Sequence, residues 1–298
     1  MRDVRGKRDA ARRIRQLFPV IACLLLLAAG CRQDGNVTEK EPEEAVQEKA
    51  PLTYTFVDVY GEEYEAELLE DVPLCRYDYS RLEKLNGFQY YRDESGEITS
   101  RTGIDVSKYQ PDADWEKVHA SGVEFAMIRL GFRGYGEAGK LVEDECYRKH
   151  MQGALDAGLD VGVYFFSQAL NEEEAREEAR FVLERVKDYD LRYPIVFDTE
   201  EIKNAKARTD GLTGAQFTDN CIAFCEEIEA AGYPVMIYAN MKWMAFTLEL
   251  PRLTEYEFWY ADYEERPQCP YAIRMWQYTE KGKVPGINGA VDINLYFE

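Results

Sequence analysis

The chain has 298 residues, of which 46% are hydrophobic and 13% aromatic, so it can bury one sizeable core and a smaller one. Its formal net charge of −20 argues against nucleic acid as a partner, because phosphates require a basic surface. The two histidines have no metal-ligand spacing, and HExxH, CxxC and P-loop motifs are absent from the sequence. We therefore expect no metal or other cofactor, and zinc hydrolases, Ser-His-Asp hydrolases and nucleotide enzymes are poor candidates.

The first 30 residues have the pattern of an export signal. Seven Lys and Arg residues precede an apolar run, residues 17–29, that is short for a membrane span. The segment Leu27-Ala28-Ala29-Gly30-Cys31 resembles the lipobox of bacterial lipoproteins, although Ala28 stands where that pattern prefers Leu. The resemblance implies a lipoprotein signal peptide over residues 1–30, acylation of Cys31, and a lipid anchor at the outer face of the bacterial cytoplasmic membrane. A plain secretory signal and an uncleaved anchor helix are the alternatives.

Two segments separate this signal from the main domain. Residues 31–50 are rich in Glu, Lys, Gln and Pro, which predicts a flexible polar spacer. Residues 51–100 alternate apolar and polar side chains over short stretches such as Tyr54 to Tyr60, which predicts a small β-rich module. The sequence leaves the role of this module open between packing against the main domain and binding the cell wall or a partner.

From Gly103 onward, strand and helix patterns alternate. The pattern predicts an irregular TIM-like (β/α) barrel over residues 101–298, with eight strands and fewer than eight helices. Helices are few because the connections after Tyr238 are short and irregular. The predicted helices are 115–120, 144–157, 172–186 and 214–231. The predicted strands are 103–106, 125–130, 160–166, 194–198, 234–238, 257–261, 273–276 and 290–293.

Four carboxylates stand at the predicted strand ends. An apolar run from Pro194 ends in Asp198 and Glu200, whose Cβ atoms should lie roughly 6–7 Å apart on the same side of a strand. Asp105 ends the first strand and Asp292 lies in the last, and these strands are neighbours in a closed barrel. Crowded carboxylates raise at least one pKa, as a general acid requires, while an ionised partner stabilises positive charge at a sugar. The pattern favours glycoside cleavage, and solvated strand ends or loop caps are the alternative.

Several short segments, taken together and in order, resemble the family-25 glycoside hydrolases, the Chalaropsis-type lysozymes. The resemblance covers about residues 103–298. It implies a muramidase that cleaves the β-1,4 bond between N-acetylmuramic acid and N-acetylglucosamine, with peptidoglycan glycan strands as its substrate. The segments are GIDVSKYQ at 103–110, DW at 114–115, IRLG at 128–131, GVYFFS at 162–167, DTE at 198–200, FWYADY at 258–263, WQY at 276–278 and VDIN at 291–294.

The same resemblance assigns roles to the four acids. Glu200 resembles the general acid of the family. Asp198 resembles the carboxylate that supports the transition state, either directly or by orienting the acetamido group of the substrate. Asp105 and Asp292 match further acids of the catalytic site that position the substrate and tune this pair.

The resemblance also indicates a substrate groove and two departures from the family pattern. Thr199 stands where many members carry an aromatic residue, and Phe165 where others carry His, so both are expected to alter the shape of a subsite. For the groove residues, an ordinary aromatic core is the alternative. The groove residues are Tyr164, Tyr238, Trp259 and Gln277.

Two other functions compete with a muramidase. A catalytically silent glycan-binding lipoprotein on the same barrel has no need to crowd carboxylates at one rim, which argues against it. A chitinase-like glycosidase carries the longer acid series DxxDxDxE, of which only Asp198-x-Glu200 is present here. We expect a monomer attached to the membrane through the lipid at Cys31.

Overall fold

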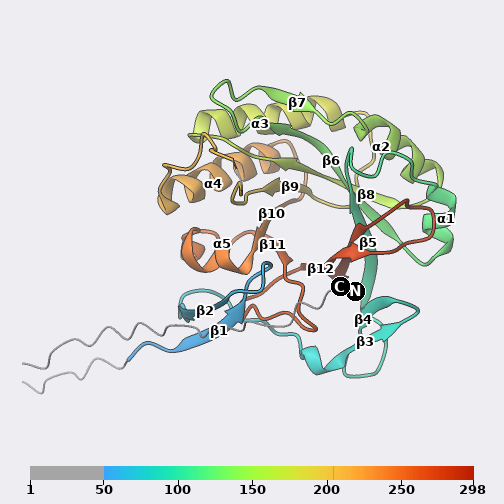
Figure 1. The fold of residues 1–298 in the computed structure, drawn as a ribbon, viewed down its shortest axis with the longest axis horizontal. Coiled ribbons are helices and arrows are strands. Elements are labelled where there is room, and N and C mark those ends of the chain that lie inside the picture. The colour runs from blue at the N-terminus through green and yellow to red at the C-terminus, as the bar shows by residue number, and fades with distance from the viewer. Residues whose placement is uncertain (1–49, 204) are drawn as a thin grey trace, which may run out of the picture. The chain divides into compact units, whose positions relative to one another are not determined.

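The computed structural model describes residues 50–203 and 205–298 of the protein (Figure 1). The predicted signal peptide 1–30, the acylation site Cys31 and the spacer up to residue 49 lie outside the described residues. Residues 50–298 belong to one compact unit.

Eight strands form a closed barrel, as predicted. Within the barrel, β5, β6 and β8 to β12 run parallel to one another, whereas β13 is antiparallel to both β12 and β5 and closes the barrel between them. A short strand outside the barrel, β7 (Leu141–Glu143), pairs with β6. The barrel strands are β5 (Ser100–Val106), β6 (Phe125–Arg133), β8 (Asp160–Phe166), β9 (Ile195–Asp198), β10 (Val235–Asn240), β11 (Glu257–Ala261), β12 (Met275–Gly282) and β13 (Val291–Phe297).

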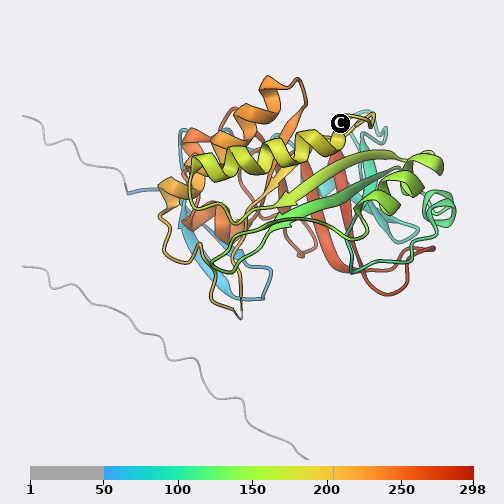
Figure 2. The same ribbon diagram turned by 90° about the horizontal axis from the view of Figure 1, so that it is seen from above.

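The described residues contain five α-helices, which confirms the prediction of fewer than eight. Figures 1 and 2 show α2 and α3 along the outer face of β6 and β8, with α4 beside α3. Asparagine, aspartate or threonine caps four of the five N-termini by accepting a backbone N–H. The helices are α1 (Trp115–Ala120), α2 (Tyr147–Asp156), α3 (Glu172–Val186), α4 (Gly214–Ala230) and α5 (Met241–Phe246), and two short 3₁₀ turns are η1 (Tyr79–Arg81) and η2 (Leu250–Arg252).

Inward-facing side chains change from apolar to polar toward the C-terminal ends of the parallel strands. Side chains on a strand alternate between faces, so Met236 and Tyr238 on β10 both point into the barrel, as do Met275 and Gln277 on β12. The apolar side chains, among them Phe125, Met236 and Met275, pack together as one buried cluster that closes one end of the barrel. The polar side chains, such as Tyr238 and Gln277, therefore lie at the other end, where the C-termini of the parallel barrel strands meet.

The module formed by residues 51–100 packs against the barrel. Its two hairpins are β1 (Thr53–Val57) with β2 (Glu63–Glu67), and β3 (Leu82–Leu85) with β4 (Phe88–Tyr91). Gln268, in the loop after β11, accepts the N–H of Val57 at 2.8 Å and donates to its carbonyl at 2.8 Å. The Tyr77 ring stacks on Phe297 of β13 with 4.3 Å between ring centroids. Of the roles that the sequence left open, the structure shows packing against the main domain.

Candidate active site

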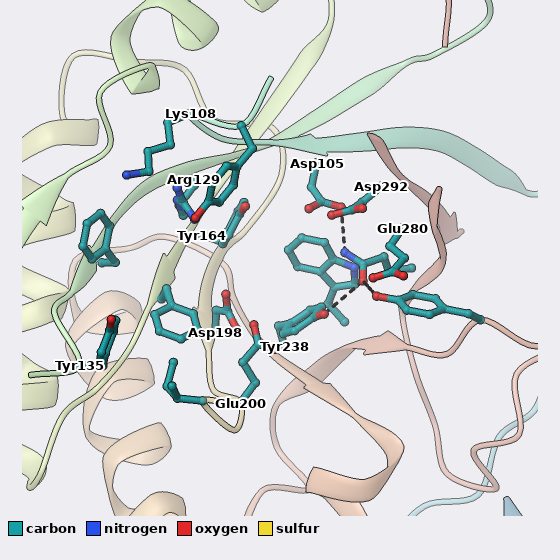
Figure 3. Close-up of a pocket in the computed structure, with 17 residues that line it drawn as sticks. Asp105, Lys108, Arg129, Tyr135, Tyr164, Asp198, Glu200, Tyr238, Glu280 and Asp292 are labelled. Carbon is teal, nitrogen blue, oxygen red and sulfur yellow. Dashed lines mark hydrogen bonds between the residues drawn. The ribbon is translucent and has the colours of Figure 1, made fainter. Parts of the chain in front are cut away.

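A cavity of about 600 Å³ opens at the polar end of the barrel (Figure 3). Its walls come from the C-terminal ends of the parallel strands and from the first residues of the antiparallel β13. The structure brings all eight residues that the sequence indicated to this one cavity. They are Asp105, Tyr164, Asp198, Glu200, Tyr238, Trp259, Gln277 and Asp292.

The direction of β13 is what places Asp292 in the cavity. Asp292 is the second residue of this strand and lies opposite Asp105 in the antiparallel register. A parallel last strand would carry its second residue to the opposite, apolar end of the barrel. The sequence indicated that Asp105 and Asp292 are neighbours, but it did not indicate the reversal that makes them so.

A hydrogen-bond network fixes the Asp105 carboxylate. Its Oδ2 accepts from the side-chain amides of Gln277 at 3.0 Å and Asn294 at 2.9 Å. Trp259 donates its indole N–H to Asn294 at 2.8 Å, and the hydroxyl of Tyr238 donates to the Gln277 carbonyl at 3.1 Å. Both amides therefore have their carbonyl oxygens engaged, which leaves their N–H groups to face the carboxylate.

One proton links Asp105 and Asp292. Burial raises the pKa of Asp105, while the amides of Asn294 and Gln277 and a hydrogen bond with Asp292 act in the opposite direction. Burial and the neighbouring Asp105 raise the pKa of Asp292 to about 9. At neutral pH, Asp292 is therefore a neutral acid that donates to the ionised Asp105.

Asp198 and Glu200 form a second carboxyl pair at the end of β9. Both side chains point into the cavity near Tyr238 (Figure 3). Burial and the negative charge of Asp105 raise the pKa of Glu200 to about 7. Burial and Glu200 raise the pKa of Asp198 well above its usual range, whereas the guanidinium of Arg129 lowers it. The charge of Glu200 raises the pKa of Asp198, so the two acids do not ionise together near neutral pH.

The segment between these two acids is held from the outside of the barrel. Thr199 is buried, and its hydroxyl accepts the indole N–H of Trp243 on α5 at 3.1 Å. Its backbone N–H donates to the carbonyl of Tyr238 at 3.3 Å. Thr199 therefore fixes the turn that directs Glu200 into the cavity.

The expected effect of Phe165 on a subsite is wrong. Phe165 is fully buried against Phe181 of α3, with 5.8 Å between ring centroids, and does not line the cavity. Neighbouring side chains on a strand point to opposite faces, so Tyr164 takes the inward position and Phe165 the outward one.

The aromatic residues of the groove are also part of the barrel interior. Trp259 is 1% exposed, and the rings of Tyr164 and Tyr238 contact it edge-on with centroid distances of 5.7 and 4.9 Å. These rings form the floor of the cavity, so the functional and the core interpretations both describe them.

Sequence reasoning missed several residues that shape the site. Arg129 lines the cavity and is held by Asp144, whose Oδ2 accepts its Nε–H at 2.8 Å. Asn294 binds Asp105, and Tyr263 donates its hydroxyl to Gln277 at 3.0 Å. A signal existed for two of them, because Arg129 is a charge within an apolar strand and Asn294 lies two residues from Asp292. Within the described ranges, no group of three or more His, Cys, Asp or Glu side chains is placed to hold a metal ion.

Comparison with known proteins agrees with this geometry. An uncharacterised protein, YegX of Escherichia coli K12, is 29% identical over 198 residues, which are 65% of this chain and 68% of that protein. The autolytic lysozyme of Clostridium acetobutylicum is 25% identical over 197 residues, 66% of this chain and 56% of that protein. The modular autolysin LytC of Streptococcus pneumoniae shares the fold, with a TM-score of 0.59, 24% identity, and coverage of 82% of this chain and 56% of LytC.

The chain thus spans little more than half of the length of these two lytic proteins. The family model of the glycosyl hydrolases family 25 matches residues 104–287, which carry Asp105, Asp198 and Glu200. The protein belongs to glycosyl hydrolases family 25.

Proposed function

We propose that this protein is an N-acetylmuramidase, a lysozyme that cleaves the β-1,4 bond between N-acetylmuramic acid and N-acetylglucosamine in bacterial peptidoglycan. The observation that carries the proposal is the pair Asp198 and Glu200, directed into one cavity at the polar end of a family-25 barrel. The similarity to an autolytic lysozyme supports the choice of peptidoglycan among glycans.

Glu200 is the proposed general acid. Its raised pKa, about 7, keeps the carboxyl protonated at mildly acidic pH. Its O–H gives the proton to the glycosidic oxygen as the bond from that oxygen to C1 of the sugar breaks. The resulting carboxylate then takes a proton from the water that adds at C1, which restores the acid.

Asp198 is the proposed stabiliser of the positive charge at C1. The guanidinium of Arg129 favours its ionised form, and Glu200 has no such cationic neighbour among the groups that set its pKa. We propose that in the reactive state this cation holds Asp198 ionised and leaves the shared proton on Glu200. The Asp198 carboxylate acts on C1 directly or by orienting the acetamido group of the substrate.

Asp105 and Asp292 position and tune the catalytic pair Asp198 and Glu200. Asp105 contributes negative charge that raises the pKa of Glu200, and Asp292 orients Asp105 through their shared proton. The substrate-binding groove comprises Tyr164, Tyr238, Trp259 and Gln277, and the apolar faces of sugars pack on its three aromatic rings.

The remaining parts of the chain determine where the enzyme acts. We propose a lipoprotein signal peptide over 1–30, a lipid anchor on Cys31 at the outer face of the cytoplasmic membrane, a spacer over 31–50, the module 51–100, and a monomeric catalytic barrel over 101–298. The basic and apolar segments of residues 1–30 and the small residues before Cys31 support this organisation. Among the described residues, no helix has the length and apolar character needed to cross a membrane.

Mass spectrometry of muropeptides tests the function. Purified protein is incubated with peptidoglycan beside the variant Glu200→Gln and the control Glu255→Gln, which changes an exposed glutamate away from the cavity. We expect fragments with a reducing-end N-acetylmuramic acid from wild type and control, and none from Glu200→Gln. Intact glycan in all samples, with protein that still sediments with the wall, would instead support the silent glycan-binding protein.

A further inference from the structure

A second cavity adjoins the first at the segment that carries Glu200. Its volume is about 390 Å³, and Glu200 and Ile202 line both cavities. This volume falls within the range of about 300–1,000 Å³ that is typical of small-molecule sites. The described residues of its lining include no Lys or Arg. They combine the aromatic residues Phe217, Trp243 and Phe246 with the polar residues Glu201, Thr209 and Asp210.

Exposed aromatic side chains gather around these two cavities. Among the described residues, four aromatic side chains are exposed, and each lies at one of the two cavities or beside the segment that joins them. Tyr109 and Tyr135 line the first cavity, Phe246 lines the second, and Tyr60 meets the segment after Glu200, where the ammonium of Lys203 lies over its ring. Because exposed aromatic rings leave apolar surface in water, their concentration in one region indicates a binding surface.

The module 51–100 builds one side of this region. Phe246, on α5, packs against Phe56 and Tyr64 of the first hairpin, with ring centroids 6.0 and 5.8 Å away. Tyr60 stands in the turn of the same hairpin. The side chain of Asp58 fixes that turn by accepting the N–H of Tyr60 at 2.9 Å and a second backbone N–H. The hairpin therefore places Tyr60 beside the segment after Glu200.

We propose that the second cavity is an additional sugar subsite, in which a pyranose ring of the glycan strand packs on Phe246, while Tyr60, beside the segment after Glu200, contacts the next part of the strand. This inference rests on the muramidase function proposed above. Sugar rings present an apolar face to aromatic side chains, and their hydroxyls donate to carboxylates such as Glu201 and Asp210. The described residues that line the cavity include acids and no cation, and the ammonium of Lys203 is engaged by the ring of Tyr60; the subsite therefore suits a neutral N-acetylhexosamine rather than a sugar that carries a carboxylate.

Tyr60 lies outside residues 104–287, the part of the chain that matches the family model. The contact with Tyr60 is therefore contributed by the N-terminal module, outside the matched part of the barrel. The proposed subsite extends the glycan-binding groove beyond Glu200. The enzyme should therefore prefer glycan chains that are long enough to reach this subsite.

Hydrolysis of peptide-free glycan chains of increasing length tests the subsite. The values of kcat/KM are compared for wild type, Phe246→Ala, Tyr60→Ala and the control Ile98→Ala, which truncates an exposed apolar residue that lines neither cavity. We expect wild type and control to favour the longer chains. In Phe246→Ala, the ratio of kcat/KM for long over short chains should fall roughly fivefold, with a smaller fall in Tyr60→Ala.

Three results would overturn the subsite. They are an unchanged ratio in both variants, an equal loss on chains of every length, and a gain with length that appears only when the chains carry stem peptides. Thermal unfolding checks the fold of each variant, and if Phe246→Ala unfolds, the exposed Tyr60→Ala decides the question. If wild type cleaves no glycan of any length, the muramidase function itself has failed.

Discussion

The neighbours of each carboxyl group in the cavity determine which of them holds a proton. Burial and the charge of Asp105 raise the pKa of Glu200 to about 7, so the general acid loses its proton, and kcat/KM falls, as the pH rises through 7. In Asp105→Asn, the removal of that charge lowers the pKa of Glu200. We therefore expect the alkaline limb of the pH profile of kcat/KM to move to lower pH. A limb that stays in place, or moves up, would contradict the influence of Asp105.

Asp292 offers a second test, because its pKa of about 9 makes it a hydrogen-bond donor at neutral pH. An amide keeps this donor, so Asp292→Asn should retain kcat/KM within about tenfold at pH 6. Asp292→Ala removes the donor and should cost roughly 10- to 100-fold more. Steady-state kinetics of the two variants measure the difference. Equal losses in both would show that Asp292 acts in its ionised form.

Residue spacing predicted the acids of the site, but it could not predict residues whose roles depend on partners far away in the sequence. Asp198 and Glu200 could be identified because an apolar strand that ends in two acids leaves them on one face. Arg129 and Asn294 were not assigned, because their roles depend on partners that are distant in sequence, Asp144 and Asp105. The amides that hold Asp105 become visible only when strands from opposite ends of the chain are paired.

At the scale of the elements, continuous apolar runs made the barrel strands recognisable. The pattern alone does not predict whether a strand runs parallel or antiparallel to its neighbours. The alternation of side chains along β13 is the same whichever way the strand runs, so only the structure shows that it is antiparallel to β5. The predicted end of β12 at Trp276 was too early, because the strand continues to Gly282 with polar side chains. Helix α5 was missed because it has six residues and follows β10 without a break.

The docking of the first hairpin gives a test at the same scale. The side chain of Gln268 replaces a strand partner for Val57 by bonding to its N–H and its carbonyl, and it also donates to Asp262 at 3.1 Å. Gln268→Ala leaves these groups without partners, so the free energy of unfolding should fall by about 1–3 kcal/mol. Urea denaturation measures it. The control Gln152→Ala, on the exposed face of α2, should stay within about 0.5 kcal/mol of wild type, and equal losses would contradict the role of Gln268.

On the scale of the whole molecule, buried acids with raised pKa values set the pH dependence of stability. Burial raises the pKa of Glu178, beside Arg133, to about 7, and that of Asp292 is raised to about 9. The folded state therefore binds more protons than the unfolded chain between about pH 4 and pH 9. Their stabilising contribution is complete below the unfolded pKa and is lost as the pH rises through the folded pKa. A net charge of −20 adds repulsion in the same direction.

We accordingly expect the protein to be more stable at pH 5 than at pH 9, by several kcal/mol. Calorimetric unfolding at intervals across this range measures the slope. Asp292→Asn removes one of the groups responsible, so its curve should be flatter toward pH 9, whereas Asp188→Asn, an exposed control, should follow wild type. Stability that rises with pH would mean that the buried acids are ionised in the folded state. The proton on Glu200, on which the proposed chemistry depends, would then be absent as well.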